Sequence, residues 1–251
     1  MAQVPEIELK DILLSNSSFG PNEITFILTK VCNDYSQFPN LKEVTGVLES
    51  QLERTPAASV RLGVCQYMIG NYETAMVTLE NADGGALAYF YQGKSQFALH
   101  NWDKAIECYE SAQRAGYNGD HCQIAIAETK RLSKDLSGAM TILDNMFGPI
   151  EQTAEYLYQR GATIAAMSDN PDEVCKLYER AVELEDSHPG ALFGLALEND
   201  RRGNDERAIE LYQRAAASFP TNVGALLNLG LIYEDHDQFE RATRCYDRIL
   251  E

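Results

Sequence analysis

The feature that most constrains this chain is an internal repeat with a period of 34 residues. Residues 223–251 align with residues 189–217, and small and large residues recur at matching places. The matching pairs are Leu192 and Leu226, Leu195 and Leu229, Ala196 and Gly230, Ala208 and Ala242, and Tyr212 and Tyr246. Such a period is typical of helix–turn–helix units that stack into a solenoid. Because neither helix of a unit can bury its apolar stripe alone, the repeat predicts an all-α, right-handed superhelical solenoid of antiparallel helix pairs.

Weaker copies of the unit extend over most of the chain. Residues 1–20 fit no copy and form an N-terminal extension, whereas residues 21–251 form the array. We expect about seven units, which are 25–55 (degenerate), 56–85 (short), 86–119, 120–154 (degenerate), 155–188, 189–222 and 223–251 (truncated). Just before the first unit, the sequence predicts a helix start at Pro21, where proline is tolerated in the first turn. It also predicts a break between helices at residues 38–40.

Small residues recur where the two helices of a unit should cross. Gly93 and Gly230 lie midway along first helices, and alanines recur at the facing place on the second helices. Since glycine costs roughly 1 kcal/mol inside a helix relative to alanine, close packing must offset that cost. Tyrosines are expected to fill the wedge beside each crossing. The predicted packing positions are Gly63, Ala75, Gly93, Ala105, Tyr109, Tyr178, Ala208, Tyr212, Gly230, Ala242 and Tyr246.

The recurring pattern L-x-x-L-G-x-x-Y, eight residues, A-x-x-x-Y-x-x-A and then proline resembles the tetratricopeptide repeat. Residues 226–246 and 192–220 carry it best, and some form of it covers about nine-tenths of the chain. The resemblance implies that the first helices of the units line a concave groove that binds a protein segment. The expected groove residues are Val60, Val64, Tyr67, Phe90, Tyr91, Lys94, Phe97, Arg160, Phe193, Leu197, Leu227 and Leu231.

The predicted groove is apolar and aromatic more than charged. Aromatic anchors of this kind are typical of surfaces that bind a peptide or a helix. The alternative is that the same side chains pack against the neighbouring first helix, and for any single residue both interpretations stay open. We favour a binding role for one group of these residues, namely Val60, Val64, Tyr67, Phe90, Tyr91 and Phe97. In a further hypothesis, residues 4–14 lie along the groove and keep it closed.

Composition and charge exclude several classes of function. The net charge of −17 disfavours contact with nucleic acid or anionic membranes, which need clustered basic residues. The N-terminus has no signal-peptide pattern, and the six cysteines are scattered, which fits reduced thiols in the cytoplasm. No set of residues suggests catalysis, a metal site or a cofactor. We therefore expect a non-enzymatic scaffold whose partner is a protein or peptide with apolar anchors.

Two alternatives to a simple peptide-binding scaffold stay open. The phrases NADGGALAYFYQGKS, EQTAEYLYQRGA, HPGALFGLALENDRRGN and LLNLGLIYEDHDQFERA resemble the N-terminal repeats of planctomycete-type bacterial proteins. Those proteins also carry a domain like the C-terminal domain of the RNA polymerase α subunit, which implies a transcription-linked adaptor. The second alternative is self-association through a truncated C-terminal face. Because the last unit has no polar capping helix, we expect a fragment whose end frays or is buried by another molecule.

Overall fold

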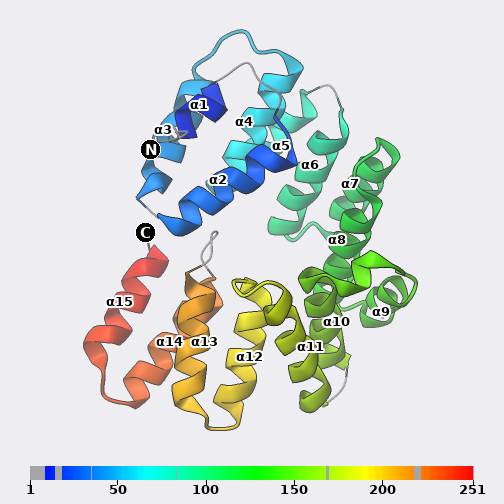
Figure 1. Cartoon of the computed structure of the whole chain (residues 1–251). Coiled ribbons are helices and arrows are strands. Elements are labelled where there is room, and N and C mark those ends of the chain that lie inside the picture. The colour runs from blue at the N-terminus through cyan, green and yellow to red at the C-terminus, as the bar shows by residue number, and fades with distance from the viewer. Residues whose placement is uncertain are drawn as a thin grey trace, which may run out of the picture. The chain divides into compact units, whose positions relative to one another are not determined.

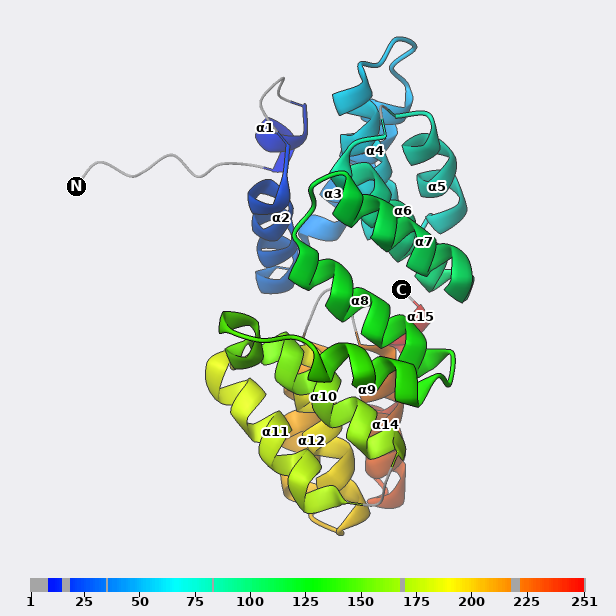
Figure 2. The ribbon, with the colours of Figure 1, turned by 90° about the vertical axis from the view of Figure 1, so that its right-hand side faces the viewer.

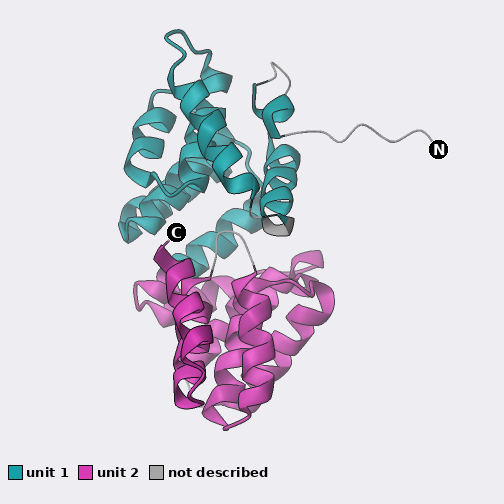
Figure 3. Ribbon diagram, turned by 90° about the vertical axis from the view of Figure 1, so that its left-hand side faces the viewer, with its two compact units in different colours: residues 1–129 teal, residues 130–251 magenta. Residues whose placement is uncertain are grey.

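The structure, a computed structural model, describes residues 9–14, 19–34, 36–82, 84–167, 170–217 and 222–250. It consists of helices, and the described residues contain no strand. The chain forms two compact units, unit 1 with residues 1–129 and unit 2 with residues 130–251 (Figure 3). The sequence predicted one array over residues 21–251, and its division into about seven repeat units stays a prediction. The expectation of an all-α solenoid built from helix pairs is confirmed within each unit.

Unit 1 contains the helices α1 (Leu9–Leu14), α2 (Pro21–Asn33), α3 (Gln37–Glu49), α4 (Pro56–Met68), α5 (Tyr72–Glu80), α6 (Ala86–Ala98) and α7 (Trp102–Arg114). From α2 to α7 each helix packs on the next one in chain order, whereas α1 packs on α3 (Figure 1). The boundary between the units falls within α8 (Gly119–Leu132). α4 packs on α6 as well as on α5. The first helices of successive pairs therefore form a row, as the solenoid pattern predicts.

Unit 2 repeats this arrangement (Figure 2). It contains α9 (Leu136–Asp144), a short 3₁₀ helix (Pro149–Gln152), α10 (Ala154–Met167), α11 (Pro171–Leu184), α12 (Pro189–Arg201), α13 (Asp205–Ala216), α14 (Val223–Asp235) and α15 (Phe239–Leu250). From α10 onwards each helix packs on the next, and α10 also packs on α12. α15 is helical as far as Leu250. None of the described helices has the length and apolar content needed to cross a membrane.

Side-chain caps fix where several first helices begin. The Thr55 hydroxyl accepts a hydrogen bond from the Ala58 amide at the start of α4, and the Asn222 side chain accepts one from Ala225 at the start of α14. Each bond satisfies an amide that has no partner inside its helix, a contribution of about 1 kcal/mol. The predicted start of α2 at Pro21 is confirmed.

The predicted break at residues 38–40 is wrong. α2 ends at Asn33, and α3 begins at Gln37 and runs through Pro39. Pro39 is the third residue of α3, where its missing amide hydrogen has no partner to lose. A proline in a helical pattern therefore marks the first turn of the second helix here, and the break lies just before it.

The described part of the N-terminal extension packs on a second helix. Leu9 and Leu13 of α1 are buried, and α1 contacts α3. The Arg61 Nη1 atom of α4 donates a hydrogen bond of 3.2 Å to the Leu13 carbonyl. α1 therefore contacts α3 and, through Leu13, the first helix α4. The hypothesis that residues 4–14 lie along the groove stays a prediction. Residues 4–8 lie outside the described residues.

A residue with positive φ closes the turn inside each of five described helix pairs. These residues are Gly70 (φ 87), His100 (φ 59), Lys134 (φ 74), Gly203 (φ 73) and Asp237 (φ 58). The next amide then reaches a carbonyl five residues back, as in the 2.9 Å bond from Asn71 to Gln66, which is the Schellman arrangement. Glycine adopts this conformation without strain, whereas a side chain costs about 1 kcal/mol or more.

In several pairs a glycine of the first helix lies directly against a side chain of the second helix. A Cβ atom added to Gly93 in α6 would lie 2.5 Å from the Tyr109 ring of α7. At Gly230 in α14, an added Cβ would collide in the same way with the Tyr246 ring of α15. Real Cβ atoms essentially never come under 3.0 Å. The facing side chain that requires glycine is thus the tyrosine ring, and the predicted alanines are buried beside it.

Other pairs use the same close approach with small changes. Gly63 of α4 faces Leu79 of α5, where an added Cβ would lie 2.5 Å from the leucine side chain. In α10 the close position belongs to Gly161, whose added Cβ would lie 2.8 Å from Tyr178 of α11. The remaining predicted packing residues that are buried are Ala75, Ala105, Ala208, Tyr212 and Ala242.

Replacing glycine by alanine should have opposite effects at two positions of unit 1. Gly93→Ala pushes a methyl group into the buried Tyr109 ring, so we expect overpacking to lower the free energy of unfolding by about 1–3 kcal/mol. Gly46→Ala in α3 adds a Cβ with nothing within 4 Å. It should raise that free energy by about 0.5–1 kcal/mol through helix propensity. Thermal unfolding followed by circular dichroism compares them, and an unchanged or higher melting temperature for Gly93→Ala would contradict the close approach.

Lysine-to-glycine substitutions should likewise separate strained from regular backbone in unit 2. Lys134→Gly relieves a positive φ of 74°. We expect it to raise the free energy of unfolding by about 0.5–1 kcal/mol, after the larger entropy of the unfolded chain is subtracted. Lys176→Gly, the matched control in the middle of α11, should cost about 1 kcal/mol. Chemical denaturation measures both. Equal losses of stability for the two variants would show that the turn carries no strain.

Candidate functional site

In unit 1, the structure brings together most of the predicted groove residues on α4 and α6. Four of them are buried, namely Val60, Val64, Phe90 and Tyr91. Val64 is fully buried, and Tyr91 retains 7% exposure. Their burial favours the packing alternative over a role as partner anchors, because a covered side chain offers no surface to a ligand. Tyr67, Lys94 and Phe97 remain half-buried.

Aromatic rings link α4, α6 and the segment after α7. The Tyr67 ring of α4 meets the Tyr91 ring of α6 edge to face, with centroids 5.4 Å apart. Phe90 stacks on Tyr117, with centroids 4.2 Å and an interplanar angle of 15°. Such pairs contribute about 0.5–1.5 kcal/mol beyond their buried area. Tyr117 was not among the predicted site residues, because it lies in a connecting segment outside the repeat pattern.

Lys94 of α6 places its ammonium group among these rings. Its Nζ atom lies 5.8 Å from the centroid of Tyr67 and 5.7 Å from that of Phe90. The electrostatic effect of Tyr67 is the largest cause that raises the pKa of Lys94 above its ordinary 10.5, and burial opposes it. The lysine is therefore charged at neutral pH, and the faces of the rings attract the charge.

The Lys94 ammonium has unused hydrogen-bonding capacity. Within the part of the chain that the structure describes, its Nζ atom makes neither a hydrogen bond nor an ion pair. An ammonium group has three donors, and ring faces do not replace an acceptor. We call Tyr67, Phe90, Tyr91, Lys94 and Phe97 the lysine–aromatic site. It offers an oriented cation beside the half-buried Tyr67 ring and the buried Phe90 ring.

In unit 2, the predicted groove residues of α10 and α12 already have partners. The Arg160 guanidinium forms an ion pair of 2.7 Å with Asp144. The Phe193 ring of α12 covers Gly224 of α14, where an added Cβ would lie 3.2 Å from the ring. This contact between neighbouring first helices is the packing alternative for Phe193. Leu197 is half-buried.

α14 presents an exposed apolar stripe. Val223, Leu227 and Leu231 are spaced by four residues and are 47%, 44% and 54% exposed. The spacing places the three side chains along one side of the helix. Leu227 and Leu231 were predicted groove residues, whereas Val223 was not, because it precedes the first position that was assigned to the groove. Leu227 and Leu231 are exposed, whereas Phe193 and Leu197, the other predicted apolar groove residues of unit 2, are half-buried.

The histidines have structural surroundings rather than the spacing of metal ligands. The described residues contain no group of three or more histidine, cysteine, aspartate or glutamate side chains that could hold a metal ion. His188 is buried as the N-cap of α12, where its Nδ1 accepts a bond of 3.1 Å from the Ala191 amide. Its Nε2 lies 3.0 Å from the Glu155 carboxylate of α10. His188 thereby links consecutive first helices, a role that its place between predicted units did not reveal.

Family models match three segments of the chain. One tetratricopeptide repeat model matches residues 176–223, and another matches residues 57–82 and 87–115. The matched segments include α4, α6 and α12, which are first helices, and their partners. No curated protein sequence matches the chain.

Solved structures share the fold at low sequence identity. A tetratricopeptide repeat protein from Parabacteroides merdae is 13% identical, with a TM-score of 0.60 over 91% of this chain and 92% of that one. PilF of Pseudomonas aeruginosa is 18% identical, with a TM-score of 0.52 over 76% and 88%. The APC/C hetero-tetramer Cut9–Hcn1 contains a chain 12% identical, with a TM-score of 0.64 over 94% of this chain and 47% of that one. These likenesses concern the fold alone.

Glu155 should control both the pKa of His188 and part of the stability of unit 2. Burial is the largest single influence and lowers the pKa of His188, but the hydrogen bond and charge of Glu155 together with the charge of Glu185 raise it, and the net pKa lies above the ordinary 6.5. The stabilisation is thus fully present below the unfolded pKa and is lost as pH rises through the folded one. Glu155→Gln should lower the pKa in an NMR titration and cost more stability at about pH 5.5 than at about pH 8. An unchanged titration would contradict this coupling.

Proposed function

We propose that the chain is a non-enzymatic protein-interaction scaffold that binds a protein segment at the lysine–aromatic site of unit 1. The matches to tetratricopeptide repeat models and the solenoid fold support an interaction scaffold. The observation that carries the choice of site is the Lys94 ammonium, which is held over two rings and lacks an acceptor among the described residues.

The chemistry of Lys94 defines one half of the ligand. A partly desolvated ammonium gains most from a negatively charged acceptor, because a hydrogen bond to a charged group is worth about 1.5–3 kcal/mol. The aromatic rings hold the side chain in one place and so reduce the entropy that binding would cost. An aspartate or glutamate side chain of the bound segment is therefore the preferred partner of Lys94.

Tyr67 and Phe97 define the other half of the ligand. Both are half-buried. The Tyr67 ring lies under the Lys94 ammonium, and Phe97 follows Lys94 by three residues on α6 and meets the Trp102 ring edge to face, with centroids 5.6 Å apart. Rigid, partly exposed aromatic rings are typical anchors in interfaces. The segment should carry an aliphatic or aromatic side chain next to its acidic residue.

The five described cysteines are free, which fits the proposed cytoplasmic location.

Self-association is a second candidate function. Leu250 of α15 is 86% exposed and Ile249 is half-buried, so this end of α15 offers an apolar group to another molecule. The transcription-linked adaptor stays a prediction from sequence resemblance, because neither the matched family models nor the three solved structures bear on it. Under both alternatives, residues 1–251 are expected to contact protein rather than nucleic acid or membrane.

The charge of Lys94 should decide which peptides the chain selects. We expect a phage-displayed peptide library panned on the full chain to yield sequences that combine an acidic residue with a nearby aromatic or aliphatic residue. Lys94→Met keeps the length of the side chain and removes its charge. It should weaken binding of the selected peptides about tenfold or more, as expected from the loss of one charge-assisted hydrogen bond. Isothermal titration calorimetry measures the dissociation constants.

The matched control is Lys104→Met, which removes an exposed lysine on α7 in the same unit. It should leave the dissociation constants within about twofold of wild type. Circular dichroism would show that both variants fold. Selected peptides that bind Lys94→Met as tightly as wild type would rule out the lysine–aromatic site.

A further inference from the structure

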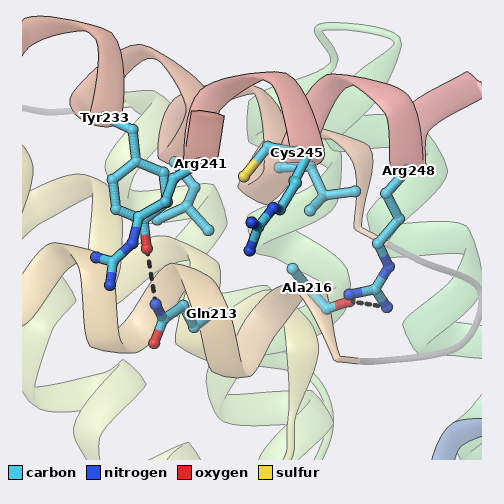
Figure 4. A pocket seen from close by; sticks show the side chains of 9 residues that line it. Gln213, Ala216, Tyr233, Arg241, Cys245 and Arg248 are labelled. Atoms are coloured by element: carbon cyan, nitrogen blue, oxygen red, sulfur yellow. Dashed lines mark hydrogen bonds between the residues drawn. The ribbon is translucent and has the colours of Figure 1, made fainter. Parts of the chain in front are cut away.

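Three helices of unit 2 enclose a pocket that the predicted groove does not include. It has a volume of about 410 Å³ and lies between α13, α14 and α15. Figure 4 shows Arg241, Cys245 and Arg248 of α15 along one side, with Gln213 and Ala216 of α13 facing them. The lining residues are Gln213, Ala216, Leu226, Leu229, Tyr233, Arg241, Arg244, Cys245 and Arg248.

The pocket is basic in a strongly acidic protein. Three of its lining residues are arginines, and none is an aspartate or glutamate, although the chain carries a net charge of −17. Arg241, Arg244 and Arg248 follow one another at intervals of three and four residues, so they share one side of α15. The row spans about 10 Å, given a rise of 1.5 Å per residue.

Two of the arginines are positioned by the walls of the pocket. Arg241 lies over the Tyr233 ring, 5.5 Å from its centroid, and donates a bond of 3.0 Å to the Gln238 side chain. Arg248 donates a bond of 3.0 Å to the carbonyl of Ala216. Neither of these contacts supplies a carboxylate. For Arg241, the fork of donors on the guanidinium is therefore only partly used.

Arg244, between them, is exposed and unpaired. Its guanidinium makes no hydrogen bond or ion pair with any residue that the structure describes. Below the arginines, Leu226, Leu229 and Cys245 are almost fully buried and form an apolar floor. Gln213 is held against the wall by a bond of 2.8 Å to the Tyr233 hydroxyl. The pocket thus combines a fixed apolar floor with a row of cations at its rim.

We propose that this pocket binds an acidic amphipathic helix of a partner protein. Guanidinium groups recognise carboxylates through paired hydrogen bonds, and a row of about 10 Å matches two turns of a helix. Carboxylates spaced like the arginines pair with the rim, and an apolar side chain between them enters the pocket. The volume lies within the range of about 300–1,000 Å³ that is usual for binding pockets. The site belongs to unit 2 and does not depend on the lysine–aromatic site.

The test uses a fluorescently labelled helical peptide with three glutamates spaced by three and four residues and one leucine among them. Fluorescence anisotropy with the full chain should show saturable binding with a dissociation constant below about 1 mM. Arg244→Glu should weaken it at least tenfold, whereas Lys176→Glu, the same charge change at an exposed residue of α11, should change it less than about threefold. Replacing the three glutamates by glutamine, or the leucine by alanine, should each weaken binding tenfold.

Each failure of this test has a distinct meaning. Equal binding to wild type and Arg244→Glu, equal binding of the glutamate and glutamine peptides, or no saturable binding would overturn the proposal. If Lys94→Met lost binding while Arg244→Glu kept it, the proposal would also be overturned, because the peptide would then occupy the lysine–aromatic site of unit 1. Unchanged binding in Lys94→Met combined with loss in Arg244→Glu supports the pocket whatever becomes of the proposal for unit 1.

Discussion

The contact on which the rest of this structure depends is that between a glycine of one helix and the ring of the next. At Gly93 and Gly230 the facing tyrosine occupies the space that any Cβ atom would need. The two backbones can then approach so closely that the apolar stripes of both helices close against each other. Because no strand ties the described helices together, this approach, repeated from pair to pair, sets how the helices are arranged within a unit.

Much of the fold follows from the sequence because the contacts that define it are local. The period of 34 residues indicated the pairs, and Gly70 and Gly203 adopt positive φ in the turns between paired helices. The error at residues 38–40 has a local cause as well, since proline is compatible with both a break and a first helical turn. His100, Lys134 and Asp237 adopt the same backbone conformation without a glycine to mark it. At these three residues, the pairing of the two helices imposes the positive φ.

The candidate sites were less predictable because burial depends on neighbours that are distant in sequence. Helical spacing could place Phe90 and Leu231 on corresponding faces, but not decide that one is covered by Tyr117 and the other is 54% exposed. Lys94 was recognised as a groove residue, whereas its position over two rings required the side-chain geometry. The arginine row of α15 was visible in the sequence, yet it lies on a second helix, and the family resemblance directed attention to first helices.

Tyr178 has a consequence for how unit 2 loses its structure. An added Cβ at Gly161 of α10 or at Gly194 of α12 would collide with its ring, so one side chain fills the space between two consecutive first helices and its own helix, α11. His188 joins the same first helices through Glu155. In a linear array, cooperativity arises from such interfaces between neighbours. The helices from α10 to α12 therefore cannot open one at a time without exposing this ring, and they should exchange their amide hydrogens as a single block.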